Sequence, residues 1–304
     1  MTDRQFSPVV MFVYAKPEHT RKTIESLAKN PEASSTDLFI YSDAAKSDKD
    51  FIAVREVRNI VSSVSGFKSV SLYFRSENIG LASNIMDGVS KVCEKYGRVI
   101  VIEDDIVTSP CFLAYMNAAL EKYEDDKRIW HVTGWNYPFL DNYMSESDAY
   151  LWRMMNCWGW GTWNDRWVNF RKDPEELIKS FSKKDISEFN LDNAFNFWSQ
   201  VEDNYNGKIN TWAIFWYATI FKNNGLCLNP VNSMVKNIGM DGTGENCNTS
   251  DIYKTKLSYE FGYRWPNEIS EDKTAINIVR EFYKSNTPTL IQRIVNKVKR
   301  TLLK

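Results

Sequence analysis

The chain of 304 residues is long enough for one large domain or two small ones, with a substantial core. Hydrophobic residues make up 43% and charged residues 25% of it, which is ordinary for a soluble globular protein. The formal net charge of -1 excludes a nucleic-acid binder that depends on bulk positive charge.

The first 130 residues alternate between expected strands and expected helices. The apolar patterns predict strands at 9–15, 37–43, 69–74 and 98–104, and helices at 17–29, 48–64 and 80–96. This alternation is typical of a parallel, doubly wound sheet, whose ligands lie outside the carboxyl ends of the strands. Asp43, Arg75 and the acidic residues 103–105 fall at such ends, so we expect a binding site there.

The stretch VIVIEDDIVTSP carries three acids directly after an apolar run: Glu103, Asp104 and Asp105. A helix cap does not explain them, because Ser109 and Pro110 already provide a cap and a first-turn proline for the helix expected at 111–123. We therefore place the triplet in the turn between strand and helix. In an extended chain Glu103 and Asp105 would share one face and Asp104 would point the other way.

Clustered carboxylates repel each other unless a cation joins them. The chain has only two histidines, His19 and His131, and its five cysteines are scattered with no CxxC pair. Zinc sites and a disulfide framework are therefore disfavoured, and a reducing cytoplasm is the simplest compartment. Mg²⁺ or Mn²⁺ is favoured, and such ions bind through a few carboxylates together with substrate phosphates, which points to a nucleotide diphosphate.

The second half of the chain is rich in tryptophan: none of the eleven precedes Trp130, and ten lie between Trp130 and Trp216. We expect helices and loops here, with most of the rings in the core and a few forming a platform for sugar faces. No linker is evident. We predict one α/β domain with a nucleotide-sugar-binding half at 1–135, an acceptor-binding half at 136–285 and a basic amphipathic tail at 286–304.

Three segments carry a resemblance to known families. Residues 99–136, with the order strand, EDD and WHVTGWN, resemble the central segment of the N-acetylglucosaminyltransferase I family. NCWGWGTWNDRW at 156–167 looks like the WGWG loop of β-1,4-galactosyltransferases and of bacterial polysaccharide glycosyltransferases. RSENIGLASNIMDGV at 75–89 is similar to the R-x-x-N-x-G segment that precedes the acidic motif in such enzymes.

The resemblance implies a GT-A fold, with a Rossmann-like, mostly parallel sheet flanked by helices, and an inverting glycosyltransferase that uses Mn²⁺ or Mg²⁺ and a nucleotide-sugar, with UDP as the expected nucleotide. Asp105 is then the metal ligand, Glu103 contacts the ribose and Asp104 the donor sugar. The full donor-binding set that we expect is Tyr14, Asp43, Arg75, Asn84, Glu103 and Asp104. The acceptor-binding set is Trp158, Gly159, Trp160 and Gly161, although core packing is the alternative for either tryptophan.

An inverting transfer needs a base for the acceptor hydroxyl. In the resembling enzymes an Asp near a late helix does this, but Asn210 stands there, and an amide cannot accept a proton at neutral pH. The other candidates are Glu202 and Asp203, Asp165, for which a salt bridge to Arg166 is the alternative, and Asp241 and Glu245 in a glycine-rich loop. Asn246 or Cys247 stands where such enzymes often carry a metal-ligating His, so metal binding would depend on Asp105 alone.

The tail at 289–304 has six apolar residues on one helical face, five basic residues and no acid. This pattern favours binding to a membrane surface over packing on the body of the protein. We therefore expect a cytoplasmic enzyme, peripheral on the inner face of the membrane, that extends a lipid-linked saccharide for capsule or O-antigen. The alternatives are a sugar nucleotidyltransferase and a non-catalytic sugar-binding protein.

Overall fold

The computed structural model describes residues 6–140, 143, 146–240 and 253–286. The contacts divide the chain into two compact units. The first comprises residues 1–173 and 210–271, and the second comprises residues 174–209 and 272–304. Within the described ranges, no helix combines the length and the apolar character needed to cross a membrane.

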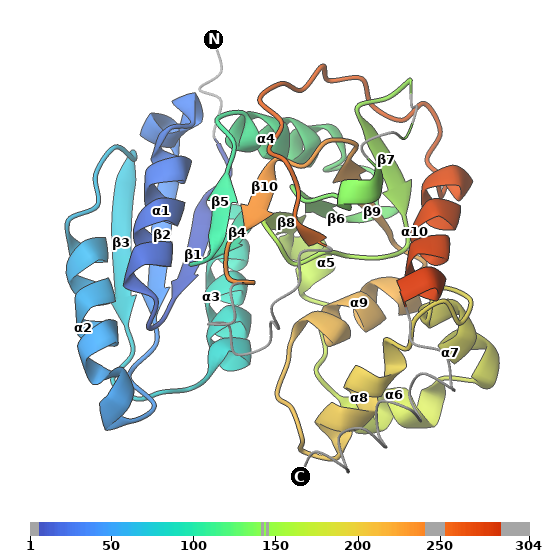
Figure 1. Ribbon diagram of the computed structural model, residues 1–304, viewed down its shortest axis with the longest axis horizontal. Coiled ribbons are helices and arrows are strands. Elements are labelled where there is room, and N and C mark those ends of the chain that lie inside the picture. The colour runs from blue at the N-terminus through green and yellow to red at the C-terminus, as the bar shows by residue number, and fades with distance from the viewer. Residues whose placement is uncertain (1–5, 141–142, 144–145, 241–252, 287–304) are drawn as a thin grey trace. The chain divides into compact units, whose positions relative to one another are not determined.

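An eight-stranded sheet forms the frame of the first unit in its described part, with the order β3-β2-β1-β4-β8-β6-β9-β7 (Figure 1). Its strands are β1 (Val9–Val13), β2 (Asp37–Ser42), β3 (Ser69–Phe74), β4 (Arg98–Glu103), β6 (Ile129–Thr133), β7 (Ala149–Trp152), β8 (Trp160–Trp163) and β9 (Leu226–Pro230). The pairs β3–β2, β2–β1, β1–β4 and β6–β9 are parallel, while β8 and β7 run antiparallel to their neighbours. The expected α/β class with a mostly parallel sheet is confirmed.

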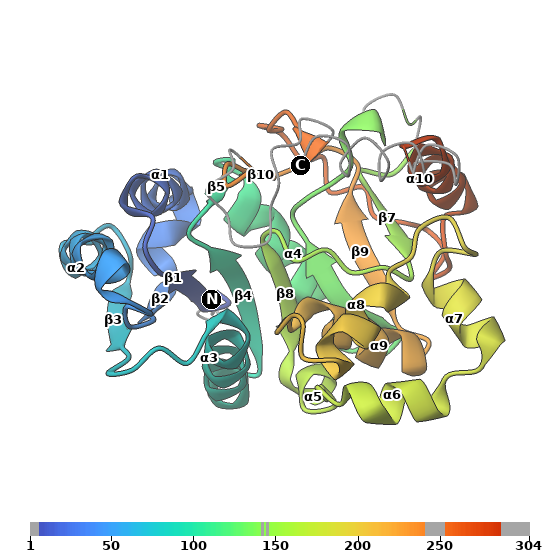
Figure 2. The same cartoon turned by 60° about the horizontal axis from the view of Figure 1, so that its bottom comes forward.

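Helices cover both faces of the parallel part. They are α1 (Pro17–Ala28), α2 (Asp48–Ser62) and α3 (Leu81–Tyr96). The first unit also contains α4 (Phe112–Lys122), α5 (Asn164–Trp167) and α9 (Ala213–Lys222), with 3-10 turns η1 (Pro31–Ser35) and η2 (Pro138–Leu140). Figure 2 shows α1 and α2 on one side of β1 and β2, with α3 on the other. Burial on both sides explains why β1 and β4 are continuous apolar runs rather than alternating patterns.

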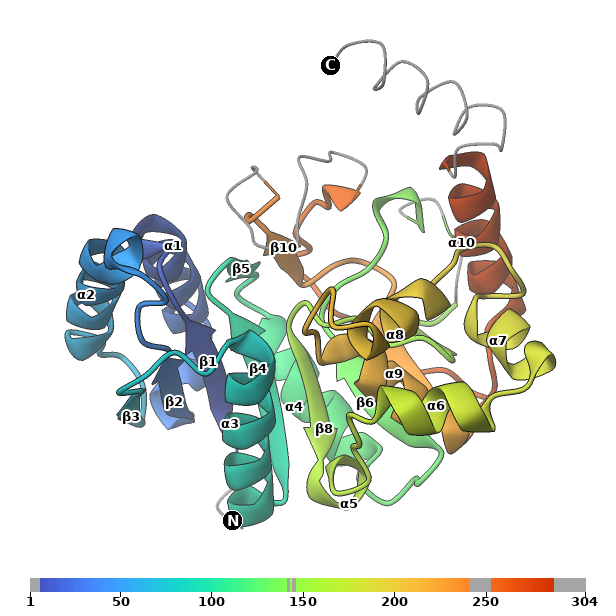
Figure 3. The same ribbon diagram turned by 90° about the horizontal axis from the view of Figure 1, so that it is seen from below.

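The second unit is helical, with α6 (Pro174–Ser180), α7 (Lys183–Phe189), α8 (Trp198–Tyr205) and α10 (Lys273–Asn286) (Figure 3). Its core forms around Trp198, whose ring lies 5.0 Å from that of Phe181 and 5.7 Å from that of Phe189. Ser182 and Asp185 form a capping box at the start of α7. The tail expected at 289–304 lies outside the described residues.

The expectation of helices and loops throughout the second half was wrong. The strands β6, β7, β8 and β9 extend the sheet there. These strands have only four or five residues and are buried, apart from Leu226 at the start of β9, so they show no alternation that would distinguish them from helix. Nine of the eleven tryptophans are buried, and only Trp158 and Trp265 are of intermediate exposure, so the core accounts for most of them.

The surroundings of the acidic triplet also differ from the expectation. Glu103 ends β4, and a short strand, β5 (Ile106–Thr108), follows before α4. β5 pairs antiparallel with β10 (Val235–Asn237), a segment far along the chain. The Ser109 N–H donates to the Met234 carbonyl at 2.8 Å. Ser109 is not the cap of α4, because Cys111 stands at the N-cap and makes no side-chain cap hydrogen bond.

Candidate active site

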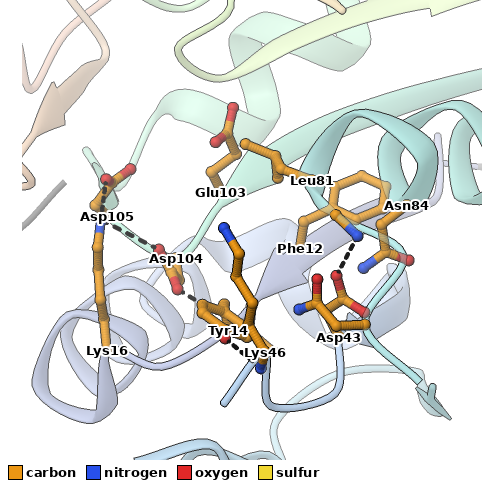
Figure 4. A pocket seen from close by; sticks show the side chains of 13 residues that line it. Phe12, Tyr14, Lys16, Asp43, Lys46, Leu81, Asn84, Glu103, Asp104 and Asp105 are labelled. Atoms are coloured by element: carbon orange, nitrogen blue, oxygen red, sulfur yellow. Dashed lines mark hydrogen bonds and ion pairs between the residues drawn. The ribbon is translucent and has the colours of Figure 1, made fainter. Parts of the chain in front are cut away.

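A pocket lies at the carboxyl ends of β1, β2 and β4 (Figure 4). The start of α3 and the turn after β4 close it on two sides. Its lining residues are Phe12, Val13, Tyr14, Lys16, Asp43, Lys46, Asn78, Gly80, Leu81, Asn84, Glu103, Asp104 and Asp105. The structure thus brings together six residues that the sequence predicted for donor and metal binding, namely Tyr14, Asp43, Asn84, Glu103, Asp104 and Asp105.

Asp43 is buried at the end of β2, where its carboxylate holds the loop that leads into α3. Its Oδ1 accepts from the backbone N–H groups of Ala44 at 2.9 Å and Ile79 at 3.1 Å, and its Oδ2 accepts from that of Gly80 at 2.9 Å. Gly80 has φ +77°, a left-handed conformation that favours glycine. With three of about four acceptor positions used, Asp43 shapes the pocket wall and keeps little capacity for a ligand.

The acidic turn faces Lys16, the residue that immediately precedes α1. Lys16 Nζ lies 3.0 Å from Asp105 Oδ2 and 4.0 Å from Asp104 Oδ1. Both aspartates therefore reach the same ammonium group, while Glu103 lies on the side of the pocket toward Leu81 (Figure 4). The alternation expected for an extended chain, with Glu103 and Asp105 on one face, does not apply, because the chain turns at 104–105.

Burial and mutual repulsion raise the proton affinity of the acids. Burial raises the pKa of Glu103 to about 8, and the charges of Asp105 and Asp104 add to this effect. Burial and the charge of Asp105 raise the pKa of Asp104 to about 7, against the opposing effect of Lys16. Burial favours a neutral Lys16, but attraction to Asp105 and Asp104 outweighs it and raises the pKa of Lys16. One ammonium group therefore does not fully neutralise this turn.

Tyr14 joins the acidic turn to the opposite wall. Its backbone N–H donates to Asp104 Oδ2 at 3.1 Å, and its hydroxyl donates to Asp50 Oδ2 at 3.1 Å. The same hydroxyl accepts from the backbone N–H of Lys46 at 2.9 Å. This chain of bonds fixes the backbone of Lys46 beside the pocket.

Arg75, predicted to bind the donor, does not line the pocket. Its Nε donates to Asn84 Oδ1 at 3.0 Å, and its Nη2 donates to Asp87 Oδ2 at 2.5 Å. Asn84 does line the pocket and is otherwise buried in α3. Arg75 therefore lies outside the pocket and orients the side chain of Asn84, which lines it.

The segment after β10 packs directly on the acidic turn. The backbone N–H of Ile238 donates to the Asp105 carbonyl at 2.9 Å, and His19 Nε2 lies 3.2 Å from the Ile238 carbonyl oxygen. A Cβ added to Gly239 would lie 2.1 Å from Asp105 Oδ2. Only a residue without a side chain fits here while the carboxylate keeps its place.

The predicted acceptor-binding residues lie mainly in the core. Trp160 and Gly161 belong to the buried strand β8, and Trp160 stacks on His131 and Trp212 with ring centroids 5.4 and 5.1 Å away. Gly159 is also buried, with φ +61°. Trp158 is of intermediate exposure and is therefore more exposed than Trp160, although its ring packs edge-on against Trp135 at 4.8 Å.

The candidate bases that the structure describes do not line the pocket. Asp165 lies in the first turn of α5 and makes ion pairs of 2.6 Å with both Lys127 and Arg166, as the salt-bridge alternative predicted. Asn210 is exposed, and its side-chain oxygen accepts from Lys172. Asp241 and Glu245, together with Asn246 and Cys247, lie outside the described residues.

The acidic turn offers the kind of ligand atoms that a hard divalent cation prefers. It offers carboxylate oxygens alone. Burial and the charge of Asp105 raise the pKa values of Glu103 and Asp104, and a cation bound beside them would favour their charged forms again. Across the described residues, no three His, Cys, Asp or Glu side chains are already gathered as a metal site. Asp105, the predicted ligand, is paired with Lys16 instead.

Lys16 and Lys46 are the two charged pocket residues that the sequence analysis missed as site residues. A signal was available for Lys16, since it follows the first strand at the same sheet edge as the acidic triplet. Lys46 follows the second strand by only a few residues and offers the same kind of signal.

Residues 85–173 match the model of the GNT-I family. The match covers less than half of the chain, and it includes the acidic turn together with β4, β5 and β8. The resemblance predicted from the acidic motif is confirmed over this segment, and it supports glycosyltransferase activity. A comparison with curated proteins finds no match.

Several solved structures are similar in part. A mannosyltransferase from Pyrobaculum calidifontis, in complex with GDP-Man and Mn²⁺, is 12% identical with a TM-score of 0.41, over 71% of this chain and 70% of that one. A UDP-glucose pyrophosphorylase complexed with UDP-glucose is 12% identical with a TM-score of 0.38, over 74% and 90%. A putative nucleotide-diphospho-sugar transferase from Desulfovibrio desulfuricans is 15% identical with a TM-score of 0.33, over 53% and 64%. At these scores the likenesses say nothing about the function of this chain.

Proposed function

We propose that this protein is a metal-dependent glycosyltransferase that moves a sugar from a nucleotide-sugar to a saccharide acceptor. The observation that carries the proposal is the pocket at the carboxyl ends of β1, β2 and β4, where Glu103, Asp104 and Asp105 converge with Lys16 and Lys46. The GNT-I match over residues 85–173, which contains those acids, supports it.

The pocket has separate places for the parts of such a donor. The loop that Asp43 holds, with Asn78 and Gly80, forms a wall with few charges that suits the nucleoside. Lys16 and Lys46 provide the positive charge that a diphosphate requires. Glu103 would accept hydrogen bonds from the ribose, and Asp104 would accept them from hydroxyls of the donor sugar.

Asp105 would hold the divalent cation, Mn²⁺ or Mg²⁺, with the diphosphate completing its coordination. Bound there, the cation would neutralise the charge that develops on the leaving diphosphate. The chain's own contribution is to exclude water from the buried acidic turn and to hold its carboxylates at fixed positions through Tyr14 and Thr23, whose hydroxyl donates to the Asp104 carbonyl at 2.9 Å.

The nucleotide, the stereochemistry of the transfer and the nature of the acceptor are inferred from the sequence alone. We infer UDP as the nucleotide, inversion at the anomeric carbon, and a lipid-linked acceptor reached by a membrane-surface tail at 289–304, on the inner face of the membrane. Residues 1–135 would bind the donor and residues 136–285 the acceptor, with Trp158 contacting the sugar. Asp241 and Glu245 remain the proposed candidates for the base, since Asp165 and Asn210 do not line the pocket.

The test is a thermal-shift series with UDP, GDP and their sugars, with and without Mn²⁺. Wild type should gain stability with one nucleotide class, and the gain should need Mn²⁺. Asp105→Ala should abolish the metal-dependent gain, while Asp165→Ala, which removes an acid outside the pocket, should retain it. Absence of any nucleotide-dependent shift in wild type would overturn the proposal.

Product analysis separates the two alternatives. A sugar nucleotidyltransferase would release or consume pyrophosphate, whereas a glycosyltransferase releases the nucleoside diphosphate. The loop after the first strand, YAKPEHTR, has no glycine of the kind that a nucleotidyltransferase needs there. Binding of the nucleotide-sugar without transfer or hydrolysis would favour the non-catalytic sugar-binding protein.

A further inference from the structure

We propose that Lys16 is a built-in counter-ion of the acidic turn, which competes with the divalent cation for Asp105 and binds the donor diphosphate once displaced. The inference rests on the proposed function and goes beyond it, because it assigns a role to a residue that neither the family resemblance nor the sequence identified.

The ion pair is held by the local fold rather than formed by two free side chains. Lys16 is the residue that precedes α1, and its carbonyl accepts from the Thr20 N–H at 2.9 Å. The acidic turn is fastened to the same helix, because Thr23 Oγ1 donates to the Asp104 carbonyl at 2.9 Å. Helix α1 thus positions both Lys16 and the turn that carries Asp105, and so it holds Lys16 Nζ close to Asp105 Oδ2.

The contact is also shielded from water. The side chains of Lys16, Asp104 and Asp105 are 21%, 10% and 12% exposed. In such surroundings the attraction between unlike charges is several times stronger than in bulk water. A metal ion that binds Asp105 Oδ2 must therefore displace an ammonium group that already neutralises it.

The displaced ammonium group would stay in the pocket. Lys16 lines the same cavity as Lys46, and its flexible four-carbon stem lets its charge move by several ångströms without any change in the backbone. A diphosphate that arrives with the metal brings negative charge for the ammonium to contact. Metal and diphosphate should therefore bind with positive coupling, and Lys16 should carry part of that coupling.

The experiment measures Mn²⁺ binding directly, from the electron paramagnetic resonance signal of free Mn²⁺, without nucleotide. Lys16→Met should bind Mn²⁺ about tenfold more tightly than wild type, because the competing charge is gone. Lys16→Arg keeps the charge and should stay close to wild type. Lys46→Met is the matched control, since it removes the same charge from the same pocket, and no ion pair of Lys46 is recorded within the described ranges; its effect should be smaller.

A second titration repeats the series in the presence of UDP or GDP. In wild type the nucleotide should tighten Mn²⁺ binding, and Lys16→Met should show a weaker tightening. Should Lys16→Met fail to fold, Lys16→Gln serves in its place, with circular dichroism to verify the fold.

Equal or weaker Mn²⁺ affinity in a folded Lys16→Met protein, with metal and nucleotide binding intact in wild type, would overturn the role of Lys16 and leave the proposed function standing. Failure of wild type and Lys16→Met alike to bind Mn²⁺ with any nucleotide would overturn both.

Discussion

Gly80 and Asp43, which lie 37 residues apart in the chain, are joined by a hydrogen bond of 2.9 Å from the glycine N–H to the Asp43 carboxylate. With the Ile79 N–H on the other oxygen, this contact ties the end of β2 to the start of α3. The carboxylate therefore replaces part of the hydrogen bonding that the first turn of a helix lacks. The same contact sets one wall of the pocket.

Asp43→Asn should destabilise the protein by about 1–3 kcal/mol, since an amide NH₂ would face a buried backbone N–H in place of an acceptor. Urea unfolding followed by circular dichroism measures the loss. Asp125→Asn is the control: Asp125 is exposed and has no recorded partner among the described residues, so its cost should stay within about 0.5 kcal/mol. Equal stability of the two variants would show that Asp43 does not hold the loop.

Gly239→Ala should weaken metal-dependent nucleotide binding much more than it lowers stability. The new Cβ would lie 2.1 Å from Asp105 Oδ2, and the nearest atoms belong to the end of that side chain, so the carboxylate can move aside at the expense of its place beside Lys16. Calorimetric titration with Mn²⁺ and nucleotide should show a loss of about tenfold or more, which corresponds to about 1.4 kcal/mol.

Gly262→Ala provides the control for Gly239→Ala. A Cβ on Gly262 would lie 2.6 Å from an oxygen of Asp148, a carboxylate that pairs with Arg264 and does not line the pocket. The Gly262→Ala substitution should therefore disturb a glycine–carboxylate contact of the same kind, and nucleotide binding should be retained. Similar binding losses in both variants would point to a general disturbance rather than to Asp105.

The first half of the fold was predictable because its strands and helices carry strong, separate patterns. The strand at 69–74 was predicted with its observed bounds, and the strand at 37–43 differs by one residue at its end. In the second half, short strands such as AYLW and WGTW are buried on both faces. Such strands have no period of their own, and their pairing with distant segments is a tertiary effect.

The site was predictable in its position but not in its contacts. Residues at the carboxyl ends of parallel strands must meet at one edge, which is why six predicted residues share the pocket. The pairing of Lys16 with Asp105, 89 residues away, depends on how α1 packs against the turn. Likewise, the sequence could not show that Gly239 would lie against Asp105, because β10 meets β5 across more than 100 residues of chain.

The buried His131 should make stability fall in acid. Burial lowers its pKa to about 3, and the neutral ring fits its surroundings, with Nδ1 accepting from the Trp216 indole N–H at 3.2 Å and Nε2 placed 2.9 Å from the Asn156 carbonyl oxygen. Below the ordinary pKa of about 6.5 the unfolded chain binds a proton that the folded protein does not bind. The stability contributed by His131 is therefore present at pH 7 and lost as the pH falls toward 3.

Urea unfolding at pH 7 and pH 5 measures this effect, with His131→Gln as the comparison. The wild type should lose about 2 kcal/mol more than the variant between the two pH values. Glu103 and Asp104, whose pKa values are raised, act in the opposite direction in both proteins and cancel in the difference. An identical pH dependence of the two proteins would show that His131 is protonated in the folded state.

Substitutions at Trp160 test whether its ring is part of the protein core or part of a platform that binds the acceptor sugar. Trp160 is 0% exposed, so Trp160→Ala should cost about 3–5 kcal/mol in urea unfolding through the cavity it leaves. Trp160→Phe should cost much less, because it keeps the stacking on His131 and removes an indole N–H that has no hydrogen-bond partner in the described structure. Trp158→Ala, at a position of intermediate exposure, should be the milder of the two alanine variants and should act on acceptor binding instead. A Trp160→Ala protein that keeps its stability but loses acceptor binding would place Trp160 on the platform and contradict its assignment to the core.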